Sequence, residues 1–149
     1  MRRLTSATIL LISFTAGGIA AKKLTIQDLP PDVQKTVQAE LKGGEIKSID
    51  RETENGVTQY EVETIRNGKH RDFEVDLKGK LLVVEEETTI ESLPAPAKAA
   101  ILKKVADGKL GMVEQVLKGG ETMFEAAYTT KTGRKHEVVV KSDGTETKD

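Results

Sequence analysis

The sequence predicts an α+β protein made of two tandem units, each with one N-terminal helix packed on a three- or four-stranded antiparallel sheet. A repeat is the first indication, because residues 26–49 align with residues 90–113 at an offset of 64. Four residues recur at that offset: Ile26, Leu29, Pro30 and Gly44 fall on Ile90, Leu93, Pro94 and Gly108. Within each repeat, apolar residues change from the four-residue spacing of a helix to the two-residue alternation of strands. Turns that contain glycine separate the alternating segments, as in antiparallel hairpins.

The N-terminus has the pattern of a secretory signal peptide. Residues 1–3 include two arginines, residues 4–16 form an apolar run of 13 residues, and residues 18–21 offer small side chains for cleavage. The run is short for a membrane-spanning helix, which needs roughly 20 apolar residues. We therefore predict a signal peptide over residues 1–21, with an uncleaved N-terminal anchor as the alternative. After cleavage, we expect a periplasmic or secreted bacterial protein with no membrane segment.

The first unit, residues 22–88, is predicted to open with a helix of three to four turns. Pro30 suits the first turn of this helix, because its fixed φ and missing N–H cost nothing there. Val33, Val37 and Leu41 recur on one face, and the Gly43-Gly44 pair can end the helix in a left-handed conformation.

Strands joined by tight turns are expected to follow this helix. Ile46 and Ile49 begin the first strand, and residues 81–84 form the last. In the two middle strands, Tyr60, Val62 and Thr64 alternate with Glu61 and Glu63, and Phe73, Val75 and Leu77 alternate with Asp72, Glu74 and Asp76. The predicted turns are Asn55-Gly56, Asn67-Gly68 and Lys78-Gly79. Such alternation gives the sheet one buried face, which the helix can cover.

The second unit, residues 89–149, repeats this order. Pro94 begins the helix, Ala97, Ile101 and Val105 form its apolar stripe, and Gly108 is expected to end it. Strands are predicted over residues 112–117, 122–129 and 135–140, and an inserted residue near position 131 changes the offset to 65. Because a unit of about 60 residues is marginally stable alone, we expect the two units to pack together. One sheet that continues through both units would achieve this.

The order of motifs in the first unit resembles the PepSY-like domain, also described as beta-lactamase-inhibitor-protein-like. The residues that carry the resemblance are Leu29, Pro30, Gly44, Ile46, Ile49, Gly56, residues 60–63, Gly68, residues 73–76 and Gly79. The second unit matches more loosely, because Phe124-Glu125-Ala126-Ala127 replaces the fuller aromatic, acidic and valine pattern. The resemblance implies two tandem helix-on-sheet modules in the bacterial periplasm or outside the cell.

Composition and motifs exclude several classes of function. The chain has no cysteine, so disulfides and thiol chemistry are excluded. After cleavage it carries 21 basic and 24 acidic residues, a balance that gives no indication of nucleic-acid binding. No nucleophile motif is present, and the two histidines, His70 and His136, make a thin metal site without further ligands. We therefore expect a protein that is not an enzyme and that has no cofactor or metal.

The acidic run of the third predicted strand begins like a calcium loop. Asp72, Glu74 and Asp76 have the spacing of loop positions 1, 3 and 5. The next required residues are missing, because Leu77 stands where glycine is needed and Val83 where glutamate is needed. We reject a calcium loop and keep a weak surface cation site as a minor alternative.

The candidate binding residues are acids that strand alternation places together on the polar face of the first sheet. They are Glu61, Glu63, Asp72, Glu74 and Asp76. Residues 22–88 carry 11 basic and 15 acidic residues, a net charge of −4, whereas residues 89–149 carry 10 and 9, a net charge of +1. We hypothesise that this face binds a basic partner, since complementary charge speeds association. A solvated face that only aids solubility is the alternative.

The function predicted from these observations is that of an exported, non-enzymatic module that binds another protein. Modules related by the resemblance occur in propeptides of secreted metallopeptidases and in inhibitors that bind an enzyme through the sheet. The resemblance carries over no catalytic residue and implies inhibition or modulation of a secreted enzyme such as a peptidase. The alternatives are an envelope structural or sensory protein that binds ions or small ligands weakly, and an unrecognised hydrolase. A monomer and a strand-paired dimer both stay open.

Overall fold

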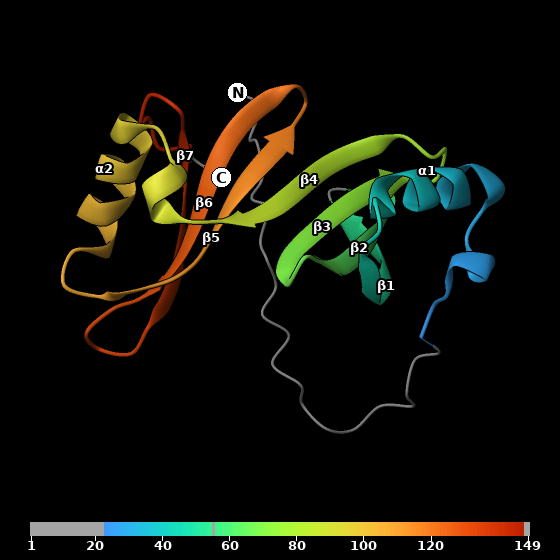
Figure 1. Cartoon of the computed structure of the whole chain (residues 1–149), viewed down its shortest axis with the longest axis horizontal. Coiled ribbons are helices and arrows are strands. Elements are labelled where there is room, and N and C mark those ends of the chain that lie inside the picture. Colours follow the sequence, from blue (N-terminus) through green and yellow to red (C-terminus); the bar gives the residue numbers. More distant parts are fainter. Residues whose placement is uncertain (1–22, 55, 148–149) are drawn as a thin grey trace.

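The computed structural model describes residues 23–54 and 56–147, so the predicted signal peptide over residues 1–21 lies outside the described residues. Within the described part, one seven-stranded antiparallel sheet carries two helices, which confirms the α+β prediction (Figure 1). The helices are α1 (Pro31–Leu41) and α2 (Ala95–Val105), and the short 3₁₀ turns η1 (Ile26–Asp28) and η2 (Ile90–Ser92) precede them. The strands are β1 (Glu45–Glu54), β2 (Val57–Arg66), β3 (Lys69–Asp76), β4 (Leu81–Thr88), β5 (Lys109–Lys118), β6 (Glu121–Thr129) and β7 (Lys135–Lys141).

The strands pair in the order in which they occur in the chain, from β1 to β7. One continuous sheet therefore joins the two predicted units, and the junction is the antiparallel pair β4–β5, in which Thr88 faces Val113. After β7, Glu146 forms an isolated bridge to Val140. The helices lie toward opposite ends of the sheet, and β4 runs between the two halves (Figure 1).

Both helices cover the same face of the sheet. Directly paired residues share a face, and the registers connect Val62 of β2 to Phe73 of β3, to Val84 of β4 and to Leu117 of β5. Val113 lies on this same face of β5, because it is four residues from Leu117. Val62 and Phe73 pack beneath α1, and Val113 packs beneath α2.

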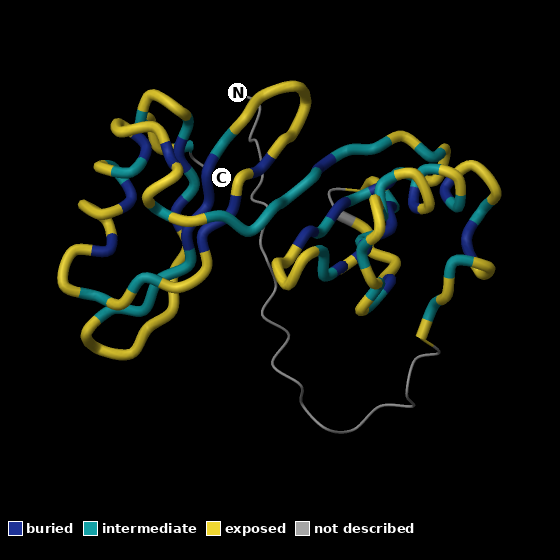
Figure 2. Tube along the Cα trace, in the orientation of Figure 1, coloured by how far each residue is buried: buried dark blue, intermediate teal, exposed yellow. Residues whose placement is uncertain are grey.

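Two separate hydrophobic cores lie on this face, and Figure 2 shows buried residues concentrated beneath each helix. The first core consists of Leu29, Val33, Val37, Ile49, Tyr60, Val62, Phe73 and Val75. The second consists of Leu93, Ala97, Ile101, Val105, Val113, Phe124, Ala126, Val138 and Val140. The two cores draw on residues before and after position 88 respectively, although the domain boundary at 88 itself stays a prediction.

The helix ends differ in detail from the sequence prediction. Pro30 and Pro94 are the N-caps, so each helix begins one residue after its proline. α1 ends as expected near Gly43, with Lys42 and then Gly43 in left-handed conformations. The prediction that Gly108 ends α2 is wrong, because Ala106 is the C-cap, with φ of 47°.

Gly108 is required for another reason, which is a close approach between two segments of backbone. A Cβ atom there would lie 2.6 Å from the carbonyl oxygen of Thr129. Two turn glycines show an equivalent constraint at the starts of the helices. A Cβ on Gly79 would lie 2.6 Å from the carbonyl oxygen of Asp32, and one on Gly144 would lie 2.7 Å from that of Pro96. The turns after β3 and β7 therefore press against the first turns of α1 and α2.

Candidate functional site

The face of the sheet opposite α1 and α2, here called the open face, collects acidic side chains from β1 through β7. No helix of the described chain packs on this face. Strand alternation and the registers place the following acids on it: Asp50, Glu52, Glu61, Glu63, Asp72, Glu74, Asp76, Glu85, Glu87, Glu114, Glu125 and Glu137.

Many of these acids stand directly opposite one another on neighbouring strands. The opposed pairs are Asp50–Glu61, Glu61–Glu74, Asp72–Glu85, Glu87–Glu114 and Glu114–Glu125. Each neighbouring strand pair from β1 to β6 thus contains an acid facing an acid. Directly opposed residues have Cβ atoms only about 4.5–5.5 Å apart, and like charges at that separation are destabilising. The row of opposed acids is named the acidic ladder below.

Glu61 lies at the centre of the β1–β3 part of the ladder. Burial raises the pKa of Glu61 to about 8, and the negative charges of Glu52, Glu63, Glu74 and Asp72 add to the rise. A carboxyl group in this environment holds its proton at neutral pH, which lessens the repulsion along the row.

Glu85 and Glu114 continue the ladder into the second half of the sheet. Burial raises the pKa of Glu85 to about 7, and the charges of Glu114, Glu74 and Asp72 raise it further, whereas Lys118 lowers it. Burial likewise raises the pKa of Glu114 to about 7, with additions from Asp72, Glu87 and Glu137 and an opposing effect from His70. The side chain of Glu114 is only 7% exposed.

The structure brings three of the five sequence-predicted site residues together in the ladder, namely Glu61, Asp72 and Glu74. Burial raises the pKa of Asp72, although its carboxylate accepts a hydrogen bond from the Thr64 N–H at 2.9 Å, which acts in the opposite direction.

The other two predicted residues have different surroundings. Glu63 is exposed at the border of the ladder and accepts a hydrogen bond from the Ser48 hydroxyl at 2.9 Å. Asp76 binds the backbone of the turn that follows it: its Oδ1 accepts hydrogen bonds from the N–H groups of Lys78 and Lys80 at 2.8 and 2.9 Å. Asp76 therefore stabilises the turn between β3 and β4.

Sequence reasoning missed the open-face acids of the later strands, which are Glu85, Glu87, Glu114, Glu125 and Glu137. The net charge of +1 for residues 89–149 hides them, because ten basic residues balance the acids of that segment, and Lys118, Lys135 and Lys141 lie on the same face. The available signal was the alternation of side chains along β5. Glu114 follows Val113, which belongs to the helix-covered face, so Glu114 is expected on the opposite face. This alternation could have placed Glu114 on the polar face of the second unit. Only the β4–β5 register shows that this face continues the polar face of the first unit.

A groove of about 690 Å³ borders the ladder where β4 and β5 meet. Its lining comes from four strands and from the β3–β4 and β5–β6 turns: Val57, Gln59, Glu74, residues 80–84 and residues 117–120. Glu74 belongs both to this lining and to the ladder. Val57, on the open face, is among the exposed large hydrophobic side chains, so the groove offers an apolar contact near Glu74.

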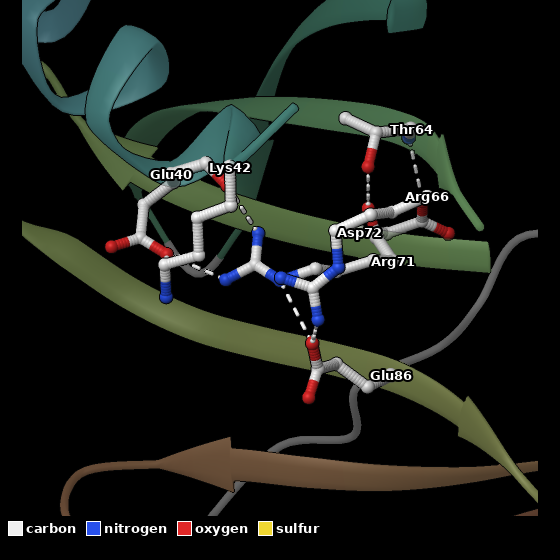
Figure 3. Close-up of polar contacts among 7 residues, drawn as sticks. All are labelled: Glu40, Lys42, Thr64, Arg66, Arg71, Asp72 and Glu86. Carbon is white, nitrogen blue, oxygen red and sulfur yellow. Dashed lines mark hydrogen bonds and ion pairs between the residues drawn. The ribbon is translucent and has the colours of Figure 1, made fainter. Parts of the chain in front are cut away.

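On the helix-covered face, a polar network around Arg71 fastens α1 to β3 and β4 (Figure 3). Arg71 is only 3% exposed, and its guanidinium donates to the backbone oxygen of Glu40 at 2.8 Å, to Glu40 Oε2 at 2.5 Å and to Glu86 Oε1 at 2.9 Å. Arg66 reaches the same oxygen of Glu86, and the Arg71 guanidinium lies 5.4 Å from the ring centre of Phe73. Burial opposes ionisation of Glu40, but hydrogen bonds from Arg71 and Lys42 outweigh it and lower the pKa of Glu40. This network has the character of a structural clamp.

The histidines do not form a joint site. His70 is exposed on β3, and its backbone N–H donates to Glu87 at 3.0 Å, whereas exposed His136 on β7 stacks on Tyr128 with ring centres 5.5 Å apart. Among the described residues, no group of three or more histidine, cysteine, aspartate or glutamate side chains is arranged to hold a metal ion. In the described part of the chain, no helix has the length and apolar character needed to cross a membrane.

Residues 32–78 match the model of the PepSY family, described as the peptidase propeptide and YPEB domain. The match confirms the PepSY resemblance within the first predicted unit, while a second copy stays a prediction. A search of curated proteins found no match to this chain.

Solved structures from Bacteroides share the fold at low sequence identity. A presumed periplasmic protein from Bacteroides eggerthii has a TM-score of 0.66 at 14% identity, over 80% of this chain and 86% of that one. A DUF2874 family protein from Bacteroides uniformis has a TM-score of 0.65 at 13% identity, over 80% and 86%. A BLIP-like protein from Bacteroides fragilis has a TM-score of 0.59 at 18% identity, over 80% and 84%.

Proposed function

We propose that this chain is an exported, non-enzymatic protein-binding module, built from two PepSY-like helix-on-sheet copies, which binds a basic partner protein through its open face. The observation that carries the proposal is the acidic ladder, in which acids face acids on each strand pair from β1 to β6. Such a row costs stability in the free protein, and a cationic surface laid over it would relieve the repulsion.

The geometry of the open face supports binding of a protein surface in preference to a small ligand. Neighbouring strands lie about 4.8 Å apart, so the ladder presents negative groups in a row that crosses most of the sheet. Complementary charge of this kind raises association rates and selects against acidic partners. The bordering groove, which includes exposed Val57, would receive an apolar side chain of the partner.

The comparisons support the class of function more than the identity of the target. The description of the family that matches residues 32–78 names peptidase propeptides, and one protein of similar structure is described as BLIP-like. We propose on this basis that the partner is a secreted enzyme such as a peptidase, and that binding inhibits or modulates it. The presumed periplasmic neighbour supports the same compartment for this chain.

The test is affinity capture from periplasmic extract and culture fluid, with residues 22–149 as bait, followed by identification and direct binding of any captured protein. The bait is compared with a variant in which four predicted site residues become isosteric amides: Glu61→Gln, Glu63→Gln, Asp72→Asn and Glu74→Gln. A matched control removes four exposed acids outside the open face: Asp32→Asn, Glu91→Gln, Asp107→Asn and Glu146→Gln.

The expected result is a basic partner that the wild type and the control variant capture equally and that the open-face variant captures at least tenfold more weakly. Binding should also weaken as salt increases, because the interaction is electrostatic. Capture that is unchanged in the open-face variant, with an unchanged salt dependence, would remove the acidic ladder from the binding surface.

A further inference from the structure

The carboxyl groups of the acidic ladder differ from ordinary surface acids in what surrounds them. Glu61 faces Asp50 and Glu52 from β1, Glu63 from its own strand, and Asp72 and Glu74 from β3. All five of these neighbours of Glu61 are acids. Its ionisation therefore adds a charge to a surface that is already negative.

Glu85 and Glu114, the ladder residues nearest the centre of the sheet, also have mainly acidic surroundings. Each has one positively charged or titratable basic group that favours its ionisation. Glu85 stands directly opposite Asp72 of β3, and the charges of Glu114, Glu74 and Asp72 oppose its ionisation, with Lys118 of β5 as the charge that favours it. Glu114 stands directly opposite Glu87 of β4 and Glu125 of β6. The charges of Asp72, Glu87 and Glu137 oppose its ionisation, and His70 is the group that favours it. Both carboxyl groups are also largely buried, which further disfavours the charged form.

We propose that pH controls binding at the open face, because acids that stand directly opposite one another on neighbouring strands cannot all ionise without repulsion. The central residues of these pairs are Glu61, Glu85 and Glu114. This inference rests on the proposed function, and it adds regulation to the same surface. The ladder therefore carries more negative charge above neutrality than in mildly acidic medium. A cationic partner therefore binds at mildly alkaline pH and leaves when the medium is acidified.

A second consequence follows from linkage between protons and partner. A cationic partner favours the ionised carboxylates, so binding near pH 7 must release protons from the ladder. The opposite behaviour is expected of ordinary exposed acids, which are fully ionised at pH 7 and have no proton to release. Proton release on binding thus separates this mechanism from simple attraction between permanent charges.

The first measurement needs no partner. Carbon-13 NMR of protein labelled at the glutamate side-chain carboxyl carbon follows each carboxyl group from pH 5 to pH 10, separately from the two imidazoles. The wild type is compared with Glu61→Gln, Glu85→Gln and Glu114→Gln, singly and combined. We expect glutamate resonances that titrate between about pH 7 and pH 8, each of which disappears in the corresponding variant.

The second measurement uses a defined cationic probe, a synthetic ten-residue peptide of alternating lysine and valine, titrated calorimetrically at fixed ionic strength. For the wild type, we expect the Kd to fall at least tenfold between pH 6 and pH 8.5, and the enthalpy at pH 7 to depend on the ionisation heat of the buffer. The triple variant should show neither effect. The control variant with Glu91→Gln, Asp107→Asn and Glu146→Gln should behave like the wild type, because those acids are exposed and lie off the open face.

The two measurements fail in distinguishable ways. If all glutamates titrate below pH 6, the pH control is overturned, while capture of a basic partner through the ladder can still be correct. If the neutral titration is present but neither the peptide nor an extract protein binds, the proposed function is overturned. A pH dependence that survives in the triple variant also overturns the inference, because other groups then cause it.

Discussion

Glu61 on β2 lies directly opposite Glu74 on β3, and the adjacent residues Val62 and Phe73 face each other in the same two strands. The two pairs project from opposite faces of the sheet, so one ribbon of backbone presents an aliphatic–aromatic contact to α1 and two carboxyl groups to the open face. Val62 and Phe73 are fully buried in the first core, and this burial offsets the cost of the opposed acids.

The opposed acids make stability depend on pH. The pKa of Glu61 is raised from its ordinary value of 4.5 to about 8, so the folded protein retains a proton that the unfolded chain has lost. The contribution of this proton to stability is complete below about pH 4.5 and is lost as pH rises toward 8. We expect the thermal midpoint of the wild type to fall between pH 5 and pH 9, and Glu61→Gln to reduce that fall.

Thermal melts followed by circular dichroism at pH 5, 7 and 9 check this expectation. Glu91→Gln is the matched control, because it removes the same charge from an exposed position in η2 and should leave the pH dependence unchanged. A Glu61→Gln protein that loses stability at pH 9 as steeply as the wild type would contradict the assignment.

The clamp around Arg71 should contribute strongly to the stability of the first half. We expect Arg71→Ala to lower the free energy of unfolding by about 2–4 kcal/mol, because Glu40 and Glu86 lose their buried ion-pair partner. The loss is limited because both carboxylates retain access to water. Arg66→Ala, which removes the more exposed arginine on Glu86, should cost less than about 1 kcal/mol.

Urea unfolding of both variants provides the comparison. A double-mutant cycle of Arg71→Ala with Glu40→Gln separates the ion pair from the packing of Arg71 on Phe73. Equal losses for Arg66→Ala and Arg71→Ala would show that burial of Arg71 adds nothing to the clamp.

The contact between the β3–β4 turn and α1 can be isolated with two glycines of nearly equal φ. Gly79 has φ of 81° and faces the carbonyl oxygen of Asp32, whereas Gly68 has φ of 78° and open space where a Cβ would be. We expect Gly68→Ala to cost about 1 kcal/mol for the left-handed backbone, and Gly79→Ala to cost about 1–3 kcal/mol more for the clash. Chemical denaturation of the two variants measures the difference, and similar losses would mean that α1 moves aside easily.

The separation of the two cores should be visible in local protection from exchange. Ile101 is fully buried beneath α2 in the second core, and Ile101→Ala should cost about 2–5 kcal/mol. We expect hydrogen exchange to accelerate mainly in β5, β6 and β7, and to change little in β1, β2 and β3. Phe73→Leu in the first core is the reciprocal variant, and uniform acceleration over the whole sheet in both would show that the halves unfold as one.

Local pattern was sufficient for the elements of this fold, because each depends on residues close in sequence. Pro30 and Pro94 indicated the helix starts, and the Asn67-Gly68 turn indicated the β2–β3 hairpin. Ala106 escaped prediction, since alanine rarely adopts positive φ and the nearby Gly108 offered the simpler ending. Gly108 is instead fixed by the backbone of Thr129, more than twenty residues away, which no local pattern reveals.

Only the part of the candidate site in the first unit could be predicted from the sequence, again because local pattern determines it. Alternation within β2 and β3 is enough to place Glu61, Asp72 and Glu74 on one face. Whether Glu114 joins them depends on which strand of the second half pairs with β4 and in which register, and a hydrophobic pattern leaves that choice open. The net charge of a whole segment was misleading, because only alternate residues of each strand project from a given face of the sheet.

The consecutive order of the strands has a consequence for how this chain acquires its structure. Each strand pairs with the one made just before it, so the contacts that build the sheet join segments separated by short loops or by one helix. Low contact order of this kind favours rapid folding, with little entropy lost in closing long loops. A chain that emerges N-terminus first from a narrow channel can add strand after strand to a growing edge, without waiting for its last residue.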